Sequence, residues 1–350
     1  MGATDPKLNE QGSPTASYKM TIDGTEYTQN DPKGVIAIVV ENHLDMIGQA
    51  KITLNAHGLN PSQFQKGKDV EIEFGGGETK AFVGVITELK HTVERGTECF
   101  LLTALDPLTK LANTRATKVW GGQTTDKIKD SDVASDVISA GGAEAGTVDA
   151  TTGERPYIYQ RAETNLAFLK RLAARNGYLL FAEEGKVQFK KPQFSDAPLE
   201  ITQGDLVKNN VHQSDVQIPT KITVFGWDEM GKKQVKGSAT PSDIDTIGSG
   251  SPPSPETTDG ELDIVDVSAS SDSACQAMAK AEMNRLARGL VKGTIEVHLN
   301  GKLVPGVKVK LEGQYTGSNP ELLVVACTHV VEVGGASSTQ IRVMGNTIPE

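Results

Sequence analysis

Two acidic pairs are the residues whose types and spacing come nearest to a catalytic arrangement. Glu71 and Glu73 lie two positions apart, and Glu183 and Glu184 are adjacent. Glycoside hydrolysis needs two carboxyl groups that face each other across a cleft, one of them with a raised pKa. The first pair alternates with apolar residues in DVEIEF, so both acids share the polar face of a strand, and the second pair lies in a turn. The spacing therefore favours solvated structural carboxylates.

Other residue types that carry chemistry are scattered along the sequence. The six histidines form no HExxH motif and no i, i+4 pair, so they do not predict a zinc site. The stretch FGGGETK lacks the GxxxxGK[ST] spacing of a phosphate-binding loop, and no GxSxG or GxGxxG motif occurs. His329 lies in an apolar strand, where a hydrogen-bonded structural histidine is expected. The sequence predicts no catalytic residue, no metal and no cofactor.

Composition further limits the classes of function that the chain could have. The chain has 350 residues, a formal net charge of −10 and three cysteines of no metal-ligand spacing, Cys99, Cys275 and Cys327. Because nucleic-acid binders need a basic footprint, the acidic balance argues against specific nucleic-acid binding. No segment approaches 18 apolar residues, so no membrane insertion is expected. Residues 1–17 are polar, with Pro and Gly, and are expected to form a disordered tail.

The elements that would position any site fall into three segments. Residues 18–105 alternate with a period of two in short runs separated by Gly and Asn, which predicts a first β-barrel. Residues 106–205 predict an α+β middle domain. Residues 206–350 return to the period of two and predict a second β-barrel. Within the third segment, residues 238–262 are rich in Ser, Pro, Gly, Asp and Thr, which predicts a mobile loop that is dispensable for the fold.

The middle segment contains the most sharply bounded pattern, a helix followed by a hairpin between Tyr157 and Phe189. Thr164 is a plausible N-cap, and Asn176-Gly177 is typical of a helix C-terminus. Between them, one face of the helix is apolar, with Leu166, Leu169, Leu172 and Ala173. The stretches YLLFA, EEG and KVQFKK then predict strand, turn and strand.

An internal repeat links the first and third segments. KGKDVEIEF at 66–74 is similar to PGVKVKLEG at 305–313, and each leads into a long apolar strand and then into a Gly turn. Gly67 aligns with Gly306, and Thr87 aligns with Thr328. The order of these matches favours two copies of one β-fold around an inserted domain. Two unrelated β-hairpins could also look alike, and this alternative stays open.

Together these stretches resemble the late control protein D family, the baseplate hubs of contractile tails and injection systems, which include the hub half of the type VI secretion VgrG protein. FVGVITELKHTVERGTECFLLTALDPLTKLA and KLVPGVKVKLEG with VVACTHVVEVGG carry the resemblance at the two ends. In the middle it rests on the helix motif of such hubs, whose matching residues are Thr164, Leu166, Phe168, Leu169, Arg171, Leu172, Ala173, Gly177 and Tyr178.

The resemblance implies a mainly β fold in which two related tube-like β-barrels flank an inserted helix–hairpin domain. It also implies a structural, non-enzymatic homotrimer whose six barrels adapt a six-fold tail tube to a three-fold spike and let DNA or cargo pass. The implied partners are a separate spike protein, a tail-tube or tube-initiator protein, baseplate wedge proteins, and a tape-measure protein or cargo in the channel. The implied location is the baseplate of a virion or injection particle, assembled in the bacterial cytoplasm. The helix motif is then scaffold.

The two repeat copies differ in charge on their aligned strands. Asp69 and Glu71 in the first copy correspond to Lys308 and Lys310 in the second. One hypothesis is that this contrast helps one barrel recognise the other across a subunit boundary. The alternatives are that these strands line the channel or face water.

Two other functions stay open at this point. One is a tail-associated hydrolase of peptidoglycan or polysaccharide, and the other is a secreted effector with a binding role. The lack of a catalytic constellation and the internal repeat argue against the hydrolase, whereas the mass and symmetry of the assembled protein would distinguish a hub from an effector.

Overall fold

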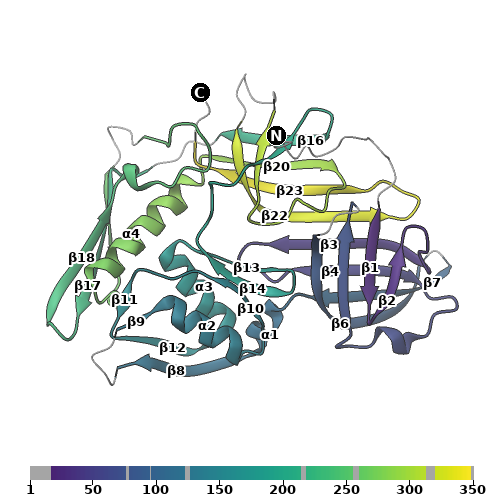
Figure 1. Ribbon diagram of the computed structural model, residues 1–350, viewed down its shortest axis with the longest axis horizontal. Helices are drawn as coiled ribbons and strands as arrows, with labels where there is room; N and C mark the ends of the chain where they lie inside the picture. Colours follow the sequence, from purple (N-terminus) through teal and green to yellow (C-terminus); the bar gives the residue numbers. More distant parts are fainter. Residues whose placement is uncertain are drawn as a thin grey trace, which may run out of the picture.

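The computed structural model describes residues 17–75, 79–94, 96–122, 127–213, 218–254, 260–312 and 320–347. The fold is mainly β, with helices gathered on one side of the molecule (Figure 1). The expected tail at residues 1–17 lies outside the described residues except for Ser17.

In the described part of the chain, the largest sheet has 13 strands, drawn from the two ends of the sequence. Its N-terminal sheet half consists of β1 (Tyr18–Ile22), β2 (Thr25–Thr28), β3 (Val35–His43), β4 (Gln49–Asn55), β5 (Asp69–Phe74), β6 (Lys80–Glu94) and β7 (Thr97–Leu105). Its C-terminal sheet half consists of β15 (Leu199–Ile201), β16 (Leu206–Gln213), β20 (Val291–His298), β21 (Lys308–Leu311), β22 (Glu321–Glu332) and β23 (Ser338–Gly345). A short 3₁₀ helix, η1 (Pro61–Phe64), precedes β5.

The two halves are one continuous sheet because β3 pairs with β22. This antiparallel junction runs from Ala326 opposite His43 to Glu332 opposite Ala37. Figure 1 shows β22 lying beside β3 where the C-terminal and N-terminal parts of the chain meet. The described strands therefore do not form two separate sheets.

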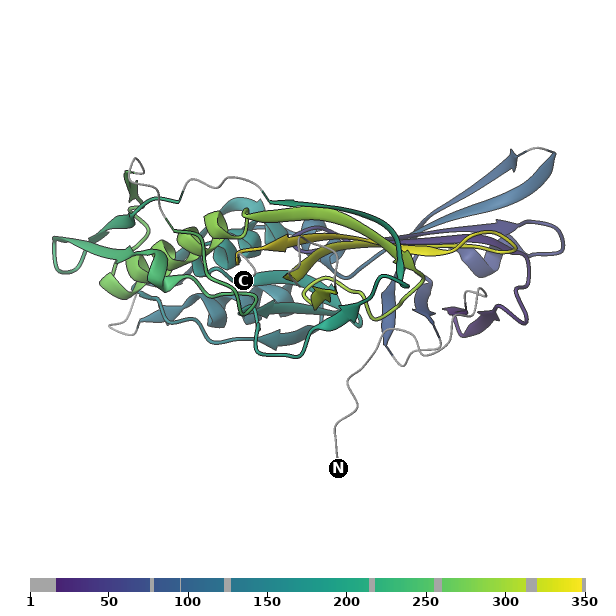
Figure 2. The same cartoon turned by 90° about the horizontal axis from the view of Figure 1, so that it is seen from above.

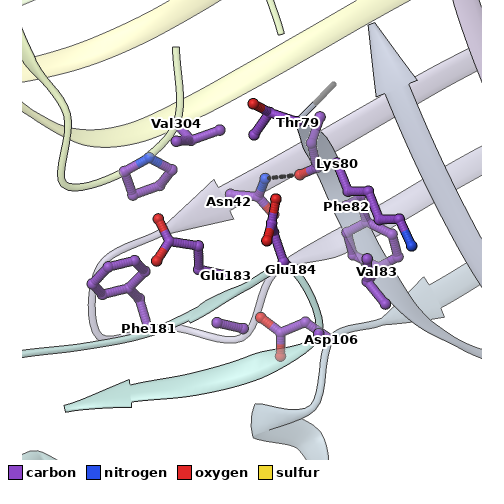
Figure 3. A pocket seen from close by; sticks show the side chains of 14 residues that line it. Asn42, Thr79, Lys80, Phe82, Val83, Asp106, Phe181, Glu183, Glu184 and Val304 are labelled. Atoms are coloured by element: carbon purple, nitrogen blue, oxygen red, sulfur yellow. Dashed lines mark hydrogen bonds between the residues drawn. The ribbon is translucent and has the colours of Figure 1, made fainter. Parts of the chain in front are cut away.

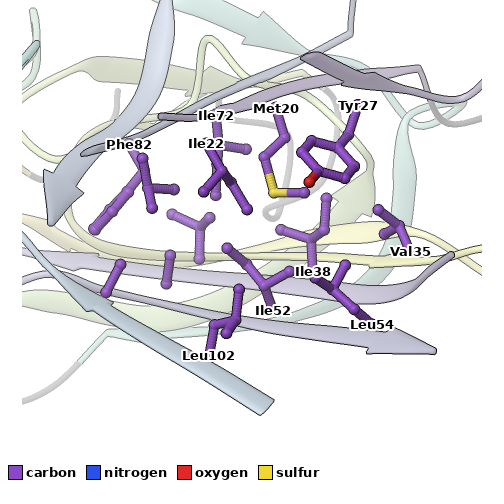
Figure 4. Packing of buried hydrophobic residues seen from close by; sticks show 14 of the residues in the cluster. Met20, Ile22, Tyr27, Val35, Ile38, Ile52, Leu54, Ile72, Phe82 and Leu102 are labelled. Atoms are coloured by element: carbon purple, nitrogen blue, oxygen red, sulfur yellow. The ribbon is translucent and has the colours of Figure 1, made fainter. Parts of the chain in front are cut away.

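The N-terminal sheet half curls around its own apolar core (Figure 4). The period of two accounts for this core, since Val70, Ile72 and Phe74 on β5 are buried while the acids between them are not. Met20 and Ile22 on β1 contribute from the strand that pairs with β5.

Both sheet halves have the same strand order. The N-terminal half runs β3-β4-β7-β6-β5, and the C-terminal half runs β16-β20-β23-β22-β21, with every neighbouring pair antiparallel. The halves differ beyond this core, because β5 is joined by β1 antiparallel whereas β21 is joined by β15 parallel.

Irregularities in the strand pairing recur at equivalent positions. In the β3–β4 pair the register shifts between Val35 and Ala37, and in the β16–β20 pair it shifts between Leu206 and Lys208. The residue numbers of the two shifts differ by an offset of 171. In β6 the shift lies between residues 86 and 88, and in β22 it lies between residues 324 and 326, an offset of 238. Because β-bulges are specific local features, two recurrences support the equivalence of the halves.

The turn before each hairpin is also shared. The N–H of Gly67 donates to Ile86 O at 2.8 Å, and the N–H of Gly306 donates to Val324 O at 2.8 Å. The two glycines have φ values of 91° and 93°, a region that side-chain-bearing residues rarely adopt. The alignment of Gly67 with Gly306 thus matches the structure. That of Thr87 with Thr328 does not, because the offset of 238 takes Thr87 to Val325.

The middle segment, which lies between the two sheet halves in the sequence, folds around a second core. Its helices are α1 (Leu108–Asn113), α2 (Asp130–Ala140) and α3 (Asn165–Asn176). Its strands are β8 (Arg115–Gly121), β9 (Ile128–Lys129), β10 (Ala145–Val148), β11 (Glu154–Arg155), β12 (Tyr157–Thr164), β13 (Leu179–Glu183) and β14 (Lys186–Lys190). β12 leads directly into α3, and β13 and β14 form the hairpin that follows it.

A further αβ layer interrupts the C-terminal sheet half between β16 and β20. It consists of β17 (Lys221–Asp228), β18 (Lys233–Ala239), the 3₁₀ helix η2 (Pro241–Asp243), β19 (Glu261–Val265) and α4 (Asp272–Ala287). These strands form a separate sheet of order β18-β17-β19, which α4 covers (Figure 1). The structure differs here from the expectation that residues 206–350 form one barrel, because strand periodicity reveals a buried face but not the sheet to which the strand belongs.

The segment expected to be a mobile loop, residues 238–262, is held in place over its first part. Asn346 accepts from Ile247 N at 2.8 Å and donates to Asp245 O at 2.7 Å. Asn284 of α4 accepts from Asp245 N at 2.8 Å. Ile247 is 1% exposed and packs with Leu323. Polar composition concealed these contacts because the hydrogen bonds use backbone groups of the segment and isolated apolar side chains such as Ile247 do the packing. Residues 255–259 lie outside the described residues.

Candidate assembly site

The residues of the predicted helix motif lie together in and around α3. Thr164 caps the helix by accepting from Ala167 N at 3.1 Å, and Gly177 ends it in the left-handed conformation with a φ of 70°. Leu166, Phe168, Leu169, Leu172 and Ala173 are buried in the core of the middle segment. These contacts are internal to the fold.

The other two polar members of the motif, Arg171 and Tyr178, also have local partners. Arg171 donates to Glu163 Oε1 at 2.6 Å and to the Tyr159 carbonyl at 3.0 Å. The hydroxyl of Tyr178 donates to Ala150 O at 2.7 Å. Arg171 therefore binds α3 to β12, and Tyr178 binds the end of α3 to the segment that contains Ala150.

A buried charge cluster next to α3, formed by Asp130, Arg155 and Arg175, was not predicted from the sequence. Asp130 at the start of α2 is 1% exposed and accepts from Arg175 Nε at 2.6 Å and from Asn176 at 2.6 Å. Arg155 lies 3.6 Å from the same carboxylate and also donates to the Ser268 carbonyl, which precedes α4. Burial, together with the charge of Arg175, lowers the pKa of Arg155 to about 10.

This cluster joins the middle segment to the α4 layer. A cation such as Arg175 in the last turn of a helix is explained by the helix dipole alone, so its type and position give no sign of a buried partner. The partners lie 45 residues apart, and no spacing rule connects residues at that distance. Gly177 also lies against Ala281 of α4, where a side chain at position 177 would meet Ala281 at 3.3 Å.

The four charges predicted as a candidate interface are not brought together. β5 and β21 are separated in the sheet by β6, β7, β4, β3 and β22. Within the described residues, Glu71 pairs with Lys80 at 2.7 Å, whereas Asp69 is exposed. Lys308 is 9% exposed and bound to Glu321 at 2.8 Å, and Lys310 lies 4.0 Å from Glu200. Three of the four charges thus have partners within the chain, and their role in a contact between subunits stays a prediction.

The β3–β22 junction is the main contact between the two sheet halves. His329 of β22 is fully buried there, with its ring centroid 5.1 Å from that of Phe74 and its Nδ1 2.9 Å from Thr339 Oγ1. Burial lowers the pKa of His329 to about 4, so the ring is neutral at pH 7. As expected from its apolar strand, His329 has a structural environment.

A small cavity of about 30 Å³ lies beside this junction, lined by both sheet halves and by the β13–β14 hairpin (Figure 3). Asp106 faces it, and its Oδ2 and Oδ1 accept from Gly48 N at 2.6 Å and from Leu108 N at 2.9 Å. Burial raises the pKa of Asp106 to about 7, although both hydrogen bonds oppose the shift. A cavity of this size holds about one water molecule, so it is too small for a substrate.

The acidic pairs do not form a hydrolytic site. Glu71 and Glu73 lie on β5, and Glu73 faces Lys19 across the strand pair. Glu183 pairs with Lys190 at 3.2 Å, and Glu184 lies in the tight turn of the hairpin. Among the described residues, no group of three or more His, Cys, Asp or Glu side chains could hold a metal ion.

The three cysteines are buried and form no disulfide bond. In the described part of the chain, no helix is both long and apolar enough to cross a membrane.

Solved structures with a similar fold are tail and secretion proteins. The tail protein from Neisseria meningitidis MC58 superposes with a TM-score of 0.68 at 14% identity, covering 95% of this chain and 97% of that one. The 43 kDa tail protein of prophage MuSo2 from Shewanella oneidensis gives 0.66 at 16% identity, covering 94% and 98%. The Escherichia coli c3393 protein, a component of the type VI secretion system, gives 0.57 at 13% identity, covering 95% and 79%. The chain therefore has the fold of phage tail proteins.

Sequence comparison adds one match. A family model described as "Alg8 N-terminal domain" matches residues 13–332. A search of curated proteins finds no significant match.

Proposed function

Because the chain belongs to the Alg8 N-terminal domain family and has the fold of phage tail proteins, we propose that it is a structural baseplate hub. The hub would be part of a contractile tail or injection machine. In this proposal the chain has no enzymatic activity of its own, and its location is the baseplate of the particle, assembled in the bacterial cytoplasm.

The observation that carries the proposal is the repeated strand order of the two sheet halves. Each half has five strands in the same arrangement, with register shifts at equivalent positions. A protein that contacts a six-fold tube with only three chains needs two equivalent units in each chain. We therefore propose that the two halves are related tube-like barrels and that three chains form a ring of six units.

The inserted segments would supply the three-fold features of the ring. The middle segment and the α4 layer occur once per chain, so a trimer carries each of them three times. A tail-tube or tube-initiator protein would bind the six similar units, and a separate spike protein would bind the three-fold face. Baseplate wedge proteins would meet the periphery.

The channel of such a ring would let DNA or protein cargo, including a tape-measure protein, pass without tight binding. The net charge of −10 supports this role, because an acidic surface repels the phosphate backbone of DNA. The charge gives no reason to expect specific nucleic-acid binding.

The test is to measure the mass of the purified chain in solution and to image it in its native particle. We expect a three-chain mass and a ring in which six similar units surround a channel. A monomer inside an intact particle would contradict the proposal. Clear turnover in a peptidoglycan turbidity assay, with lysozyme as positive control, would instead favour the hydrolase.

A further inference from the structure

The intrachain β3–β22 junction uses one defined edge from each sheet half. β3 offers the edge that faces away from β4. β22 offers residues 326–332 on the side away from β23, beyond the part of the strand that pairs with β21. The junction thus joins two different kinds of edge.

Backbone hydrogen bonds show which residues point across this junction. Leu44 N donates to Val325 O at 2.9 Å, and Val333 N donates to Ile36 O at 2.9 Å. Because backbone groups alternate in direction along a strand, the N–H groups of Ile38 and Val40 also face β22.

The equivalent edges of the other two strands have no partner strand among the described residues. The offset of 171 takes β3 to β16, which ends the 13-stranded sheet. The offset of 238 takes residues 326–332 of β22 to residues 88–94 of β6, and the pairing of β6 with β5 stops at Val85. Figure 2 shows the far half of the β6–β7 hairpin standing clear of the rest of the sheet.

Side chains along both free edges are exposed. Val93 on β6 is 62% exposed, and Val207 on β16 is 54% exposed. The neighbouring exposed residues are polar and include Lys90, Lys208 and His212. Polar edge residues limit unspecific pairing of such strands while leaving their backbone groups available.

We propose that β16 of one chain pairs antiparallel with residues 88–94 of β6 in the next chain. Adding 171 to the residue numbers of β3 and subtracting 238 from those of β22 converts the intrachain register into the expected contacts between chains. His329 opposite Val40 becomes His91 opposite Val211, and Val331 opposite Ile38 becomes Val93 opposite Asn209. Thr328 opposite Glu41 becomes Lys90 opposite His212.

This contact is head-to-tail, because each chain would use β16 toward one neighbour and β6 toward the other. Contacts of this type close into a ring when the rotation between units allows it. The inference rests on the proposed hub function and specifies how its subunits join. It also predicts that junctions within and between chains alternate around the ring and share one geometry.

The first test blocks each edge separately with proline. Val211→Pro removes an outward N–H that β20 does not use, and Val93→Pro does the same on β6. Proline is tolerated on an edge strand when the N–H would face solvent. Each variant alone should elute at the single-chain mass with the circular dichroism spectrum and melting temperature of a folded chain.

Mixing the two variants gives a more specific result. Val211→Pro keeps a functional β6 edge, and Val93→Pro keeps a functional β16 edge. The mixture should therefore form a one-to-one dimer and nothing larger. The matched controls Val211→Thr and Val93→Thr retain the N–H group and should assemble like the wild type. Full assembly of either proline variant would overturn the proposal.

The second test determines the register of the β16–β6 pairing between chains, and it does not require that the fold tolerate proline. Residues at a non-hydrogen-bonded antiparallel pair lie about 4.5 Å apart at Cα, within the range of a disulfide. Lys90→Cys combined with His212→Cys should therefore cross-link neighbouring chains on oxidation. Lys90→Cys with Asn210→Cys, a diagonal pair about 7–8 Å apart, is the off-register control. Equal cross-linking of both variants, or of neither, would overturn the proposed register.

These outcomes distinguish this inference from the proposed function. A three-chain wild type that resists both proline substitutions and forms no Lys90→Cys/His212→Cys cross-link would remain a ring with a different junction. A wild type that stays monomeric in the particle would remove the hub proposal as well.

Discussion

At the residue scale, Asp106 is the clearest source of pH dependence. Its folded-state pKa of about 7 lies above the ordinary value of 3.8, so between these values the folded chain binds more protons than the unfolded chain. Stability from this group is therefore present at low pH and lost as pH rises toward 7. The direction is opposite to that of a carboxylate in an ion pair.

We expect Asp106→Asn to remove this dependence. The difference in unfolding free energy between wild type and variant should change by a few kcal/mol between pH 4 and pH 7.5, since one pKa unit corresponds to about 1.4 kcal/mol. Urea denaturation of both proteins across this range measures it. Parallel stability curves would contradict a raised pKa of Asp106 in the folded chain.

Residue-level features could be predicted from sequence where the cause is local. Thr164 and Gly177 cap α3 through contacts within three or four positions, and local rules identify such contacts. Asp130 with Arg155 and Arg175 could not be predicted, because a buried ion cluster depends on which distant segments meet.

At the element scale, the apolar face of α3 holds the middle segment together. Leu169→Asp places a charge in a core position that is 0% exposed, which costs several kcal/mol or forces protonation. We expect insoluble or unassembled protein. Ala167→Asp, on the exposed face of the same helix, is the control and should melt near the wild-type temperature. A normal melting temperature for Leu169→Asp would contradict the core assignment.

The segment that follows β18 gives a second prediction at this scale. Asn346→Ala leaves Ile247 N–H and Asp245 C=O without their partner, and the buried Ile247 N–H left unpaired costs about 1–3 kcal/mol. We expect a lower melting temperature, measured by calorimetry, whereas Gln340→Ala, at an exposed position of β23, should change little. An unchanged temperature for Asn346→Ala would support the composition-based expectation of a dispensable loop.

Strands could be recognised from their period of two, but their neighbours could not. DVEIEF, which alternates, and the long apolar run that contains VVACTHVVE were expected to be strands, and they form β5 and β22. KITVFGW has the same kind of pattern, yet it became β17 of the separate α4 layer. A period identifies a buried face, and the pairing partner depends on chain topology.

At the scale of the whole molecule, the repeat was visible in sequence only around Gly67 and Gly306 and in the short strands that follow them. Gly67 and Gly306 match because the same turn requires a positive φ in both halves. The long strands β6 and β22 have diverged so far in sequence that Thr87 was aligned with Thr328, three positions away from its structural equivalent Val325. Strand order and register shifts preserve the relationship, because they depend on backbone geometry and tolerate many side chains.

The β3–β22 junction has a consequence for synthesis of the chain. His43 and Ala326 are paired but lie 283 residues apart (326 − 43), so β3 emerges from the ribosome long before its partner. At about 5–20 residues per second, the wait is roughly 14 to 57 s. During that time the nascent chain exposes an apolar strand edge, which is a template for pairing with other nascent chains. Expression of residues 17–205 alone should accordingly give a product that sediments with aggregates, whereas the full-length chain stays in the supernatant under the same conditions.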